Sequence, residues 1–111
     1  MLLPHMADNT IARRSAARER LAKNLKVFRG KQSMSQEALA DRAGLHRTRV
    51  VKIEQGLVNV TLDTLVSLAE ALRVDEVQLL TAHDELPTPL KSGRKTEAEK
   101  AAAQKPRRKA A

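Results

Sequence analysis

Apolar residues between positions 16 and 81 recur at intervals of three and four, which is the spacing of amphipathic helices. The first stripe runs from Ala17 through Leu21 and Leu25 to Phe28, and ends near Lys31. Shorter helical segments follow at residues 36–43, between the glycines at 44 and 56, from 61 to 72, and after 75. No segment shows the alternation of a strand. The pattern therefore predicts an all-α domain of five short helices with a small aliphatic core.

Local signals mark the ends of these helices. Met34 precedes the second helix and is expected to pack on Leu39, while Gly44 suits the left-handed residue that ends a helix. His46 stands where a capping side chain is expected for the third helix, which predicts a poorer cap there. The fourth helix is expected to bury Leu62, Leu65, Val66, Leu68, Ala69 and Leu72. The expected N-caps are Ser35, Thr61 and Asp75.

The two ends of the chain differ in composition from this middle. Residues 1–15 predict a flexible or partly helical basic arm, in which Asp8, Asn9 or Thr10 could cap a backward extension of the first helix. Residues 16–83 form the predicted domain. Residues 84–111 are rich in Lys, Arg, Ala and Pro, so we expect a disordered basic tail that cannot bury enough surface to fold.

Charge is distributed unevenly along the chain, whose net charge is +8 and whose pI is about 10.5. Residues 13–52 hold twelve Lys and Arg against three acidic residues, whereas residues 56–85 hold one Arg against six. A basic protein of this kind favours an anionic partner: nucleic acid, an anionic membrane or an acidic protein. The first three helices should meet that partner.

Several function classes find no support in the sequence. There is no Cys, and the three histidines show no metal-ligand spacing, so no metal or cofactor is expected. Neither a phosphate-cradling glycine loop nor a nucleophilic constellation is present, which argues against an enzyme. No apolar run approaches the length of a membrane span, and aromatic residues are nearly absent. We expect a cytoplasmic protein without a membrane partner.

The segment GLHRTRVVKIEQG, residues 44–56, places basic side chains on one of the predicted helices. At about 100° per residue, Val50 and Ile53 form its narrow inner edge. The opposite arc holds Arg47, Thr48, Val51, Lys52 and Gln55. Arg and Lys donate to the guanine O6 and N7 atoms, and the Thr and Val methyl groups suit the thymine methyl. This helix is suited to the edges of base pairs.

The string SQEALADRAGLHRTRVVKIEQG closely resembles the Cro/lambda-repressor-like (XRE) helix-turn-helix family, and the resemblance covers about residues 17–81. Residues in register with the family are Gln36, Leu39, Ala40, Gly44, Val50, Ile53, Glu54, Gly56 and Leu65. Arg47, Thr48 and Asn59 make the chain most similar to restriction–modification controller proteins. Phage repressors and antitoxins remain alternatives.

The resemblance implies roles for individual residues. Those implied to contact bases are Arg47, Thr48, Val51 and Lys52. Those implied to contact phosphate are Gln36, Arg49, Gln55, Asn59 and Arg29. The resemblance also implies an ion pair between Arg29 and Glu54, and a homodimer interface through Val77, Leu79 and Leu80. His46, Arg49, Val60 and Arg73 depart from common family residues, so the target sequence cannot be transferred from relatives.

Together these features predict a sequence-specific, double-stranded DNA-binding transcriptional regulator, a repressor or autoregulator that binds a palindromic operator as a homodimer. Two alternatives stay open at this point. One is an antitoxin that binds a toxin protein as well as DNA. The other is a non-specific, nucleoid-like DNA binder that depends on its basic tails.

Overall fold

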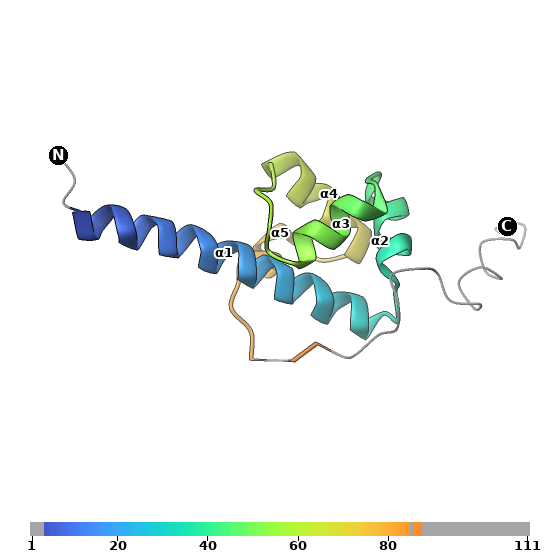
Figure 1. Cartoon of the computed structure of the whole chain (residues 1–111). Coiled ribbons are helices and arrows are strands. Elements are labelled where there is room, and N and C mark those ends of the chain that lie inside the picture. Colours follow the sequence, from blue (N-terminus) through green and yellow to red (C-terminus); the bar gives the residue numbers. More distant parts are fainter. Residues whose placement is uncertain (1–3, 85, 88–111) are drawn as a thin grey trace, which may run out of the picture.

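The computed structural model describes residues 4–84 and 86–87, and their side chains from residue 9 onward. This part of the chain folds into five helices without a strand (Figure 1). They are α1 (Pro4–Lys31), α2 (Gln36–Ala43), α3 (Arg47–Glu54), α4 (Leu62–Leu72) and α5 (Glu76–Leu80). The predicted all-α, five-helix fold is confirmed.

Helix α1 is much longer than the other four. It has 28 residues, a length of about 42 Å at the helical rise of about 1.5 Å per residue. Its second half packs against the other helices, whereas its first half extends beyond them (Figure 1). The helix begins at Pro4, a favourable residue for a first turn, so Asp8, Asn9 and Thr10 lie inside it and do not cap it. The Ala- and Arg-rich sequence from residue 11 favours this continuation.

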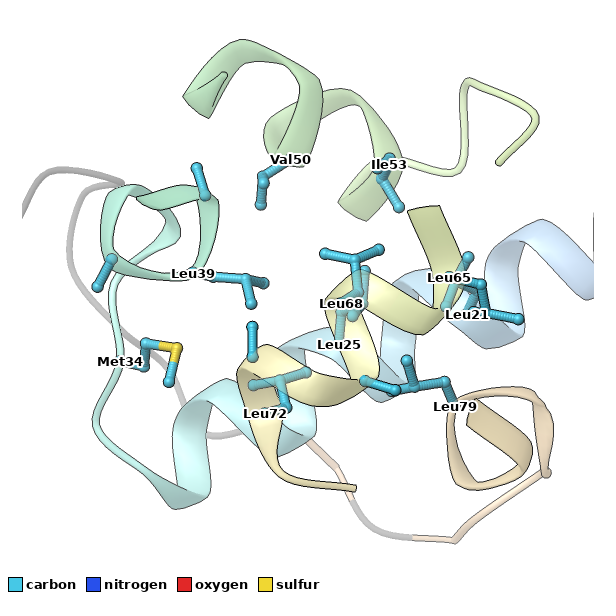
Figure 2. Close-up of a cluster of buried hydrophobic side chains, with 14 residues drawn as sticks. Leu21, Leu25, Met34, Leu39, Val50, Ile53, Leu65, Leu68, Leu72 and Leu79 are labelled. Atoms are coloured by element: carbon cyan, nitrogen blue, oxygen red, sulfur yellow. The ribbon is translucent and has the colours of Figure 1, made fainter. Parts of the chain in front are cut away.

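The core is a cluster of aliphatic side chains to which all five helices contribute (Figure 2). Each fully buried Leu, Ile or Val stabilises the fold by about 1.5–3 kcal/mol relative to an exposed one. Met34 and Leu39 are both buried in this cluster, as the expected staple at the start of α2 requires. The most deeply buried aliphatic members are Leu25, Leu39, Val50, Ile53, Leu68, Leu72 and Leu79.

Two of the expected side-chain caps are present. The Ser35 hydroxyl accepts a hydrogen bond from the Ala38 N–H at 3.0 Å, and the Thr61 hydroxyl accepts one from the Thr64 N–H at 3.1 Å. His46 makes no side-chain hydrogen bond at the start of α3, as predicted. The first turn of α3 therefore lacks a side-chain cap and depends on its packing.

Two helices end in left-handed residues. Gly44 has φ 72° after α2, as expected. Arg73 has φ 59° after α4, a left-handed conformation that favours glycine, and adopts it despite its Cβ atom. The expected tail begins at residue 84, and residues 85 and 88–111 of it lie outside the described residues.

The burial expected for α4 is partly wrong. Leu65, Leu68 and Leu72 are buried, but Leu62 is 71% exposed and Val66 is 37% exposed. The apolar positions of α4 cover more than one side of the helix, and a helix packed on a single core covers only one side. The remaining apolar side of α4 faces away from the core.

Candidate nucleic-acid interface

Helices α2 and α3 are joined by a tight turn around Gly44. The Gly44 N–H donates to the Ala40 and Asp41 carbonyls, and the Leu45 N–H donates to the Ala40 carbonyl at 2.9 Å. This bonding satisfies the free carbonyls at the end of α2 and redirects the chain into α3. The two helices then pack against each other in a helix-turn-helix arrangement.

Helix α3 packs on the core through its inner edge. Val50 and Ile53 are fully buried in the core, as Figure 2 shows. Arg47, Thr48 and Lys52 are exposed, while Val51 is half-buried. A helix of eight residues is not stable in isolation, so this docking is what orders it. The residues expected to contact bases thus lie on the outer side of a well-anchored helix.

A buried ion pair supports the last turn of α3. The Arg29 Nε donates to Glu54 Oε2 at 2.6 Å, and Arg29 Nη2 donates to Glu54 Oε1 at 2.8 Å. The two side chains are 8% and 2% exposed. Arg29 Nη1 also donates to the Met34 carbonyl, and Gln36 Nε2 donates to Glu54 Oε1 at 3.0 Å. One carboxylate therefore connects α1, α2 and α3.

This network changes the role of one expected phosphate contact. All three guanidinium nitrogens of Arg29 donate to buried partners, so this side chain is not presented to a ligand. We therefore assign Arg29 to positioning α3, in place of the expected phosphate contact. Gln36 is half-buried and directs its amide toward Glu54, while its backbone lies in the first turn of α2.

The remaining expected phosphate contacts lie at and beyond the end of α3. Gln55 and Asn59 are exposed, and Arg49 is half-buried. Arg49 Nη2 donates to the Asn59 carbonyl at 3.3 Å and thereby ties α3 to the loop before α4. The structure brings Arg49 and Asn59 together at one edge of the helix-turn-helix.

The expected dimer residues are divided between the core and the surface. Leu79 is fully buried in the protomer's own core, so its expected place in the interface is wrong. Val77 is 63% exposed and Leu80 is 43% exposed. Leu80 lines one hollow together with the exposed Leu62 of α4, and we call the exposed apolar residues Leu62, Val66, Val77 and Leu80 the α4–α5 face. Leu62 and Val66 were expected to be buried, although the excess width of the apolar pattern on α4 was a signal that some of its apolar residues lie outside the core.

Asn24 is a third residue whose role the sequence did not predict. It is 1% exposed, and its Nδ2 donates at 2.8 Å to the carbonyls of Leu79 and Thr81. Because free carbonyls at a helix C-terminus need partners, this amide fixes the end of α5 against α1. An isolated Asn on a helix carries no local signal for such a role.

Other kinds of site are not found in the described residues. No group of His, Asp and Glu there could hold a metal ion. No helix in that part of the chain is both long and apolar enough to cross a membrane.

Comparison with known proteins identifies the domain. A helix-turn-helix family model matches residues 25–79. Control protein C.SmaI of Serratia marcescens is 45% identical over 64 residues, which cover 58% of this chain and 76% of the relative. Control protein C.BamHI of Bacillus amyloliquefaciens is 46% identical over 50 residues, which cover 45% of this chain and 62% of the relative.

Solved structures of similar proteins support the same identification. The controller protein C.AhdI from Aeromonas hydrophila aligns with a TM-score of 0.56 and 34% identity, over 58% of this chain and 97% of that chain. A hypothetical transcription factor from Neisseria aligns with a TM-score of 0.58 and 39% identity, over 60% of this chain and 76% of that chain. The chain therefore belongs to the XRE-type helix-turn-helix family of DNA-binding transcription regulators and is related to restriction–modification controller proteins.

Proposed function

We propose that this chain is a sequence-specific regulator that binds a palindromic operator as a homodimer, with α3 in the major groove. The observation that carries the proposal is the exposure of Arg47, Thr48 and Lys52 on a helix whose other side is fixed in the core. Arg47 would donate a bidentate pair to guanine, and Lys52 would reach the same acceptors or a phosphate. Thr48 and the half-buried Val51 would offer methyl groups to thymine.

The α4–α5 face supports the homodimer. Leu62, Val66, Val77 and Leu80 are large apolar side chains that the protomer leaves exposed on two neighbouring helices. Exposed large apolar side chains that gather on neighbouring helices mark interaction sites. A two-fold pairing through this face would present two copies of α3, and two copies on successive major grooves lie about 34 Å apart. The operator would then be a palindrome.

The proposed regulatory role is inferred from the relatives of the chain. Two of them are named control proteins, and C.AhdI is described as a restriction–modification controller protein. We infer that the chain is a repressor or autoregulator of that type.

Selection of bound fragments from a random double-stranded DNA pool tests the proposal. We expect one enriched palindrome with half-sites about one helical turn apart. Arg47→Ala should lose the preference at one base position in each half-site, whereas Arg42→Ala, an exposed arginine on α2, should keep the full palindrome. A pool without an enriched site would overturn sequence-specific binding.

A further inference from the structure

The part of α1 that precedes residue 25 is basic and lies outside the matched family domain. The family match begins at residue 25, whereas α1 begins at Pro4. The intervening turns carry an excess of positive charge, and the first half of α1 extends past the rest of the domain (Figure 1). The residues that supply this charge are Arg13, Arg14, Arg18, Arg20 and Lys23, with Asp8 and Glu19 opposing them.

Two of these arginines lie beside the loop that follows α3. Arg14, Ala17, Arg18 and Asn59 line a surface hollow of about 390 Å³. Asn59 is also the residue whose carbonyl accepts a hydrogen bond from Arg49 of α3. Three arginines from two helices therefore gather around one exposed loop residue, and no carboxylate is among the described residues that line the hollow.

The spacing along α1 explains why these two arginines gather there and the others do not. Arg14 and Arg18 are four residues apart and lie on the same side of the helix as Leu21 and Leu25, which face the core. That side of α1 is the one on which the rest of the domain packs. Arg13 and Arg20 do not line the hollow that Arg14 and Arg18 share with Asn59, and instead line a neighbouring one that Arg14 also borders.

We propose that Arg14 and Arg18 extend the DNA-binding surface by binding backbone phosphates next to the recognition helix. The proposal rests on the proposed function, since it assigns the strip of Arg49, Asn59, Arg18 and Arg14 to the same DNA molecule. Guanidinium groups bind phosphate in a bidentate manner, and an amide side chain adds a neutral donor. The strip is continuous with α3 because Arg49 directly follows Thr48 and donates to the Asn59 carbonyl.

The chemistry of this strip predicts affinity without sequence preference. Phosphate contacts fix the protein on the duplex but carry no base information. Each phosphate contact adds about 0.9 unit to the slope of log affinity against log salt. Two arginines in each of two protomers would add a slope of about four units.

The test compares two double variants of the full chain that remove equal charge from the same helix. Arg14→Ala/Arg18→Ala removes the strip, and Arg13→Ala/Arg20→Ala is the matched control. Alanine is the best helix former, so both variants should keep α1 intact, which circular dichroism checks. Affinities for the selected operator and for a scrambled duplex are then measured over a series of salt concentrations.

We expect Arg14→Ala/Arg18→Ala to lower the salt slope by about four units on both duplexes and to leave their affinity ratio nearly unchanged. The control should lower the slope far less. Equal losses from both variants would overturn the proposal, because they would show general charge attraction. An unchanged slope with weaker dimerisation in the absence of DNA would also overturn it, by assigning the arginines to the partner protomer.

Failure of the proposed function would give a different result. If random-pool selection enriches no site, sequence-specific binding fails. The slope difference between the two variants on scrambled duplex still decides the role of Arg14 and Arg18.

Discussion

Arg29 of α1 and Glu54 of α3 are joined by two parallel hydrogen bonds of 2.6 and 2.8 Å beneath the helix that carries Arg47. A planar guanidinium suits this two-point geometry better than an ammonium group does. Glu54 also accepts from Gln36 of α2, so its carboxylate holds three helices at the point where α3 ends. The orientation of α3 therefore depends on a charge pair as well as on Val50 and Ile53.

Removing one partner of this pair should strongly destabilise the fold. Arg29→Met leaves the carboxylate of Glu54 buried without its countercharge, which costs about 3–5 kcal/mol of the free energy of unfolding. Lys31→Met is the control, because Lys31 is exposed on the same helix and its cation–π contact with Phe28 is worth under about 1 kcal/mol. Urea unfolding followed by circular dichroism measures both. Equal losses from the two variants would contradict a buried role for Arg29.

The sequence predicted the helices well because their signals are local. Ser35 and Gly44 mark the two ends of α2 through their own backbone preferences, and the bounds of that helix are as expected. Burial in α4 and α5 was harder to predict. Leu62 and Leu79 are the same residue type in similar helical patterns, yet one is exposed and the other buried. That difference depends on how the helices pack together, which the spacing along a single helix does not contain.

The candidate DNA-binding site was likewise predicted in part from the sequence. The helical period of α3 predicted which of its residues face outward, because Val50 and Ile53 define the inner side. The arrangement of arginines around Asn59 could not be predicted from the sequence, because Arg14 and Asn59 are 45 positions apart and meet only in the folded domain. The capping of α5 by Asn24 is equally a product of tertiary structure.

Substitutions at adjacent residues of α5 should have separate effects, one on folding and the other on dimerisation. Leu79→Ala removes a fully buried side chain and should cost about 2–5 kcal/mol of the free energy of unfolding. Leu80→Glu and Val77→Glu change exposed residues of the α4–α5 face, so they should give folded monomers with weakened operator binding. Sedimentation equilibrium and thermal melting together measure these effects. A wild-type protein that stays monomeric even on palindromic DNA would contradict the homodimer.

The amide of Asn24 should matter more than a similar amide at the surface. Asn24→Leu leaves the buried Leu79 carbonyl and the partly buried Thr81 carbonyl without their donor, and should cost about 1–3 kcal/mol of the free energy of unfolding. Gln32→Leu removes a bond from Nε2 to the Leu72 carbonyl at 2.7 Å, whose donor side chain belongs to an exposed residue, so it should cost less. Chemical denaturation compares the two variants. A loss for Gln32→Leu as large as that for Asn24→Leu would contradict the capping role.

Arg47 should determine sequence preference rather than general affinity. Loss of one bidentate guanine contact costs about 1–3 kcal/mol in each half-site and relaxes the preference at a single base position. Arg47→Ala should therefore reduce the ratio of operator affinity to scrambled-duplex affinity. Arg42→Ala removes the same charge from an exposed site on α2 and should leave that ratio unchanged. Titrations of both duplexes at several salt concentrations measure the ratio and the salt slope together. If Arg47→Ala weakens both duplexes equally, Arg47 binds phosphate, and the assignment of α3 to base recognition is wrong.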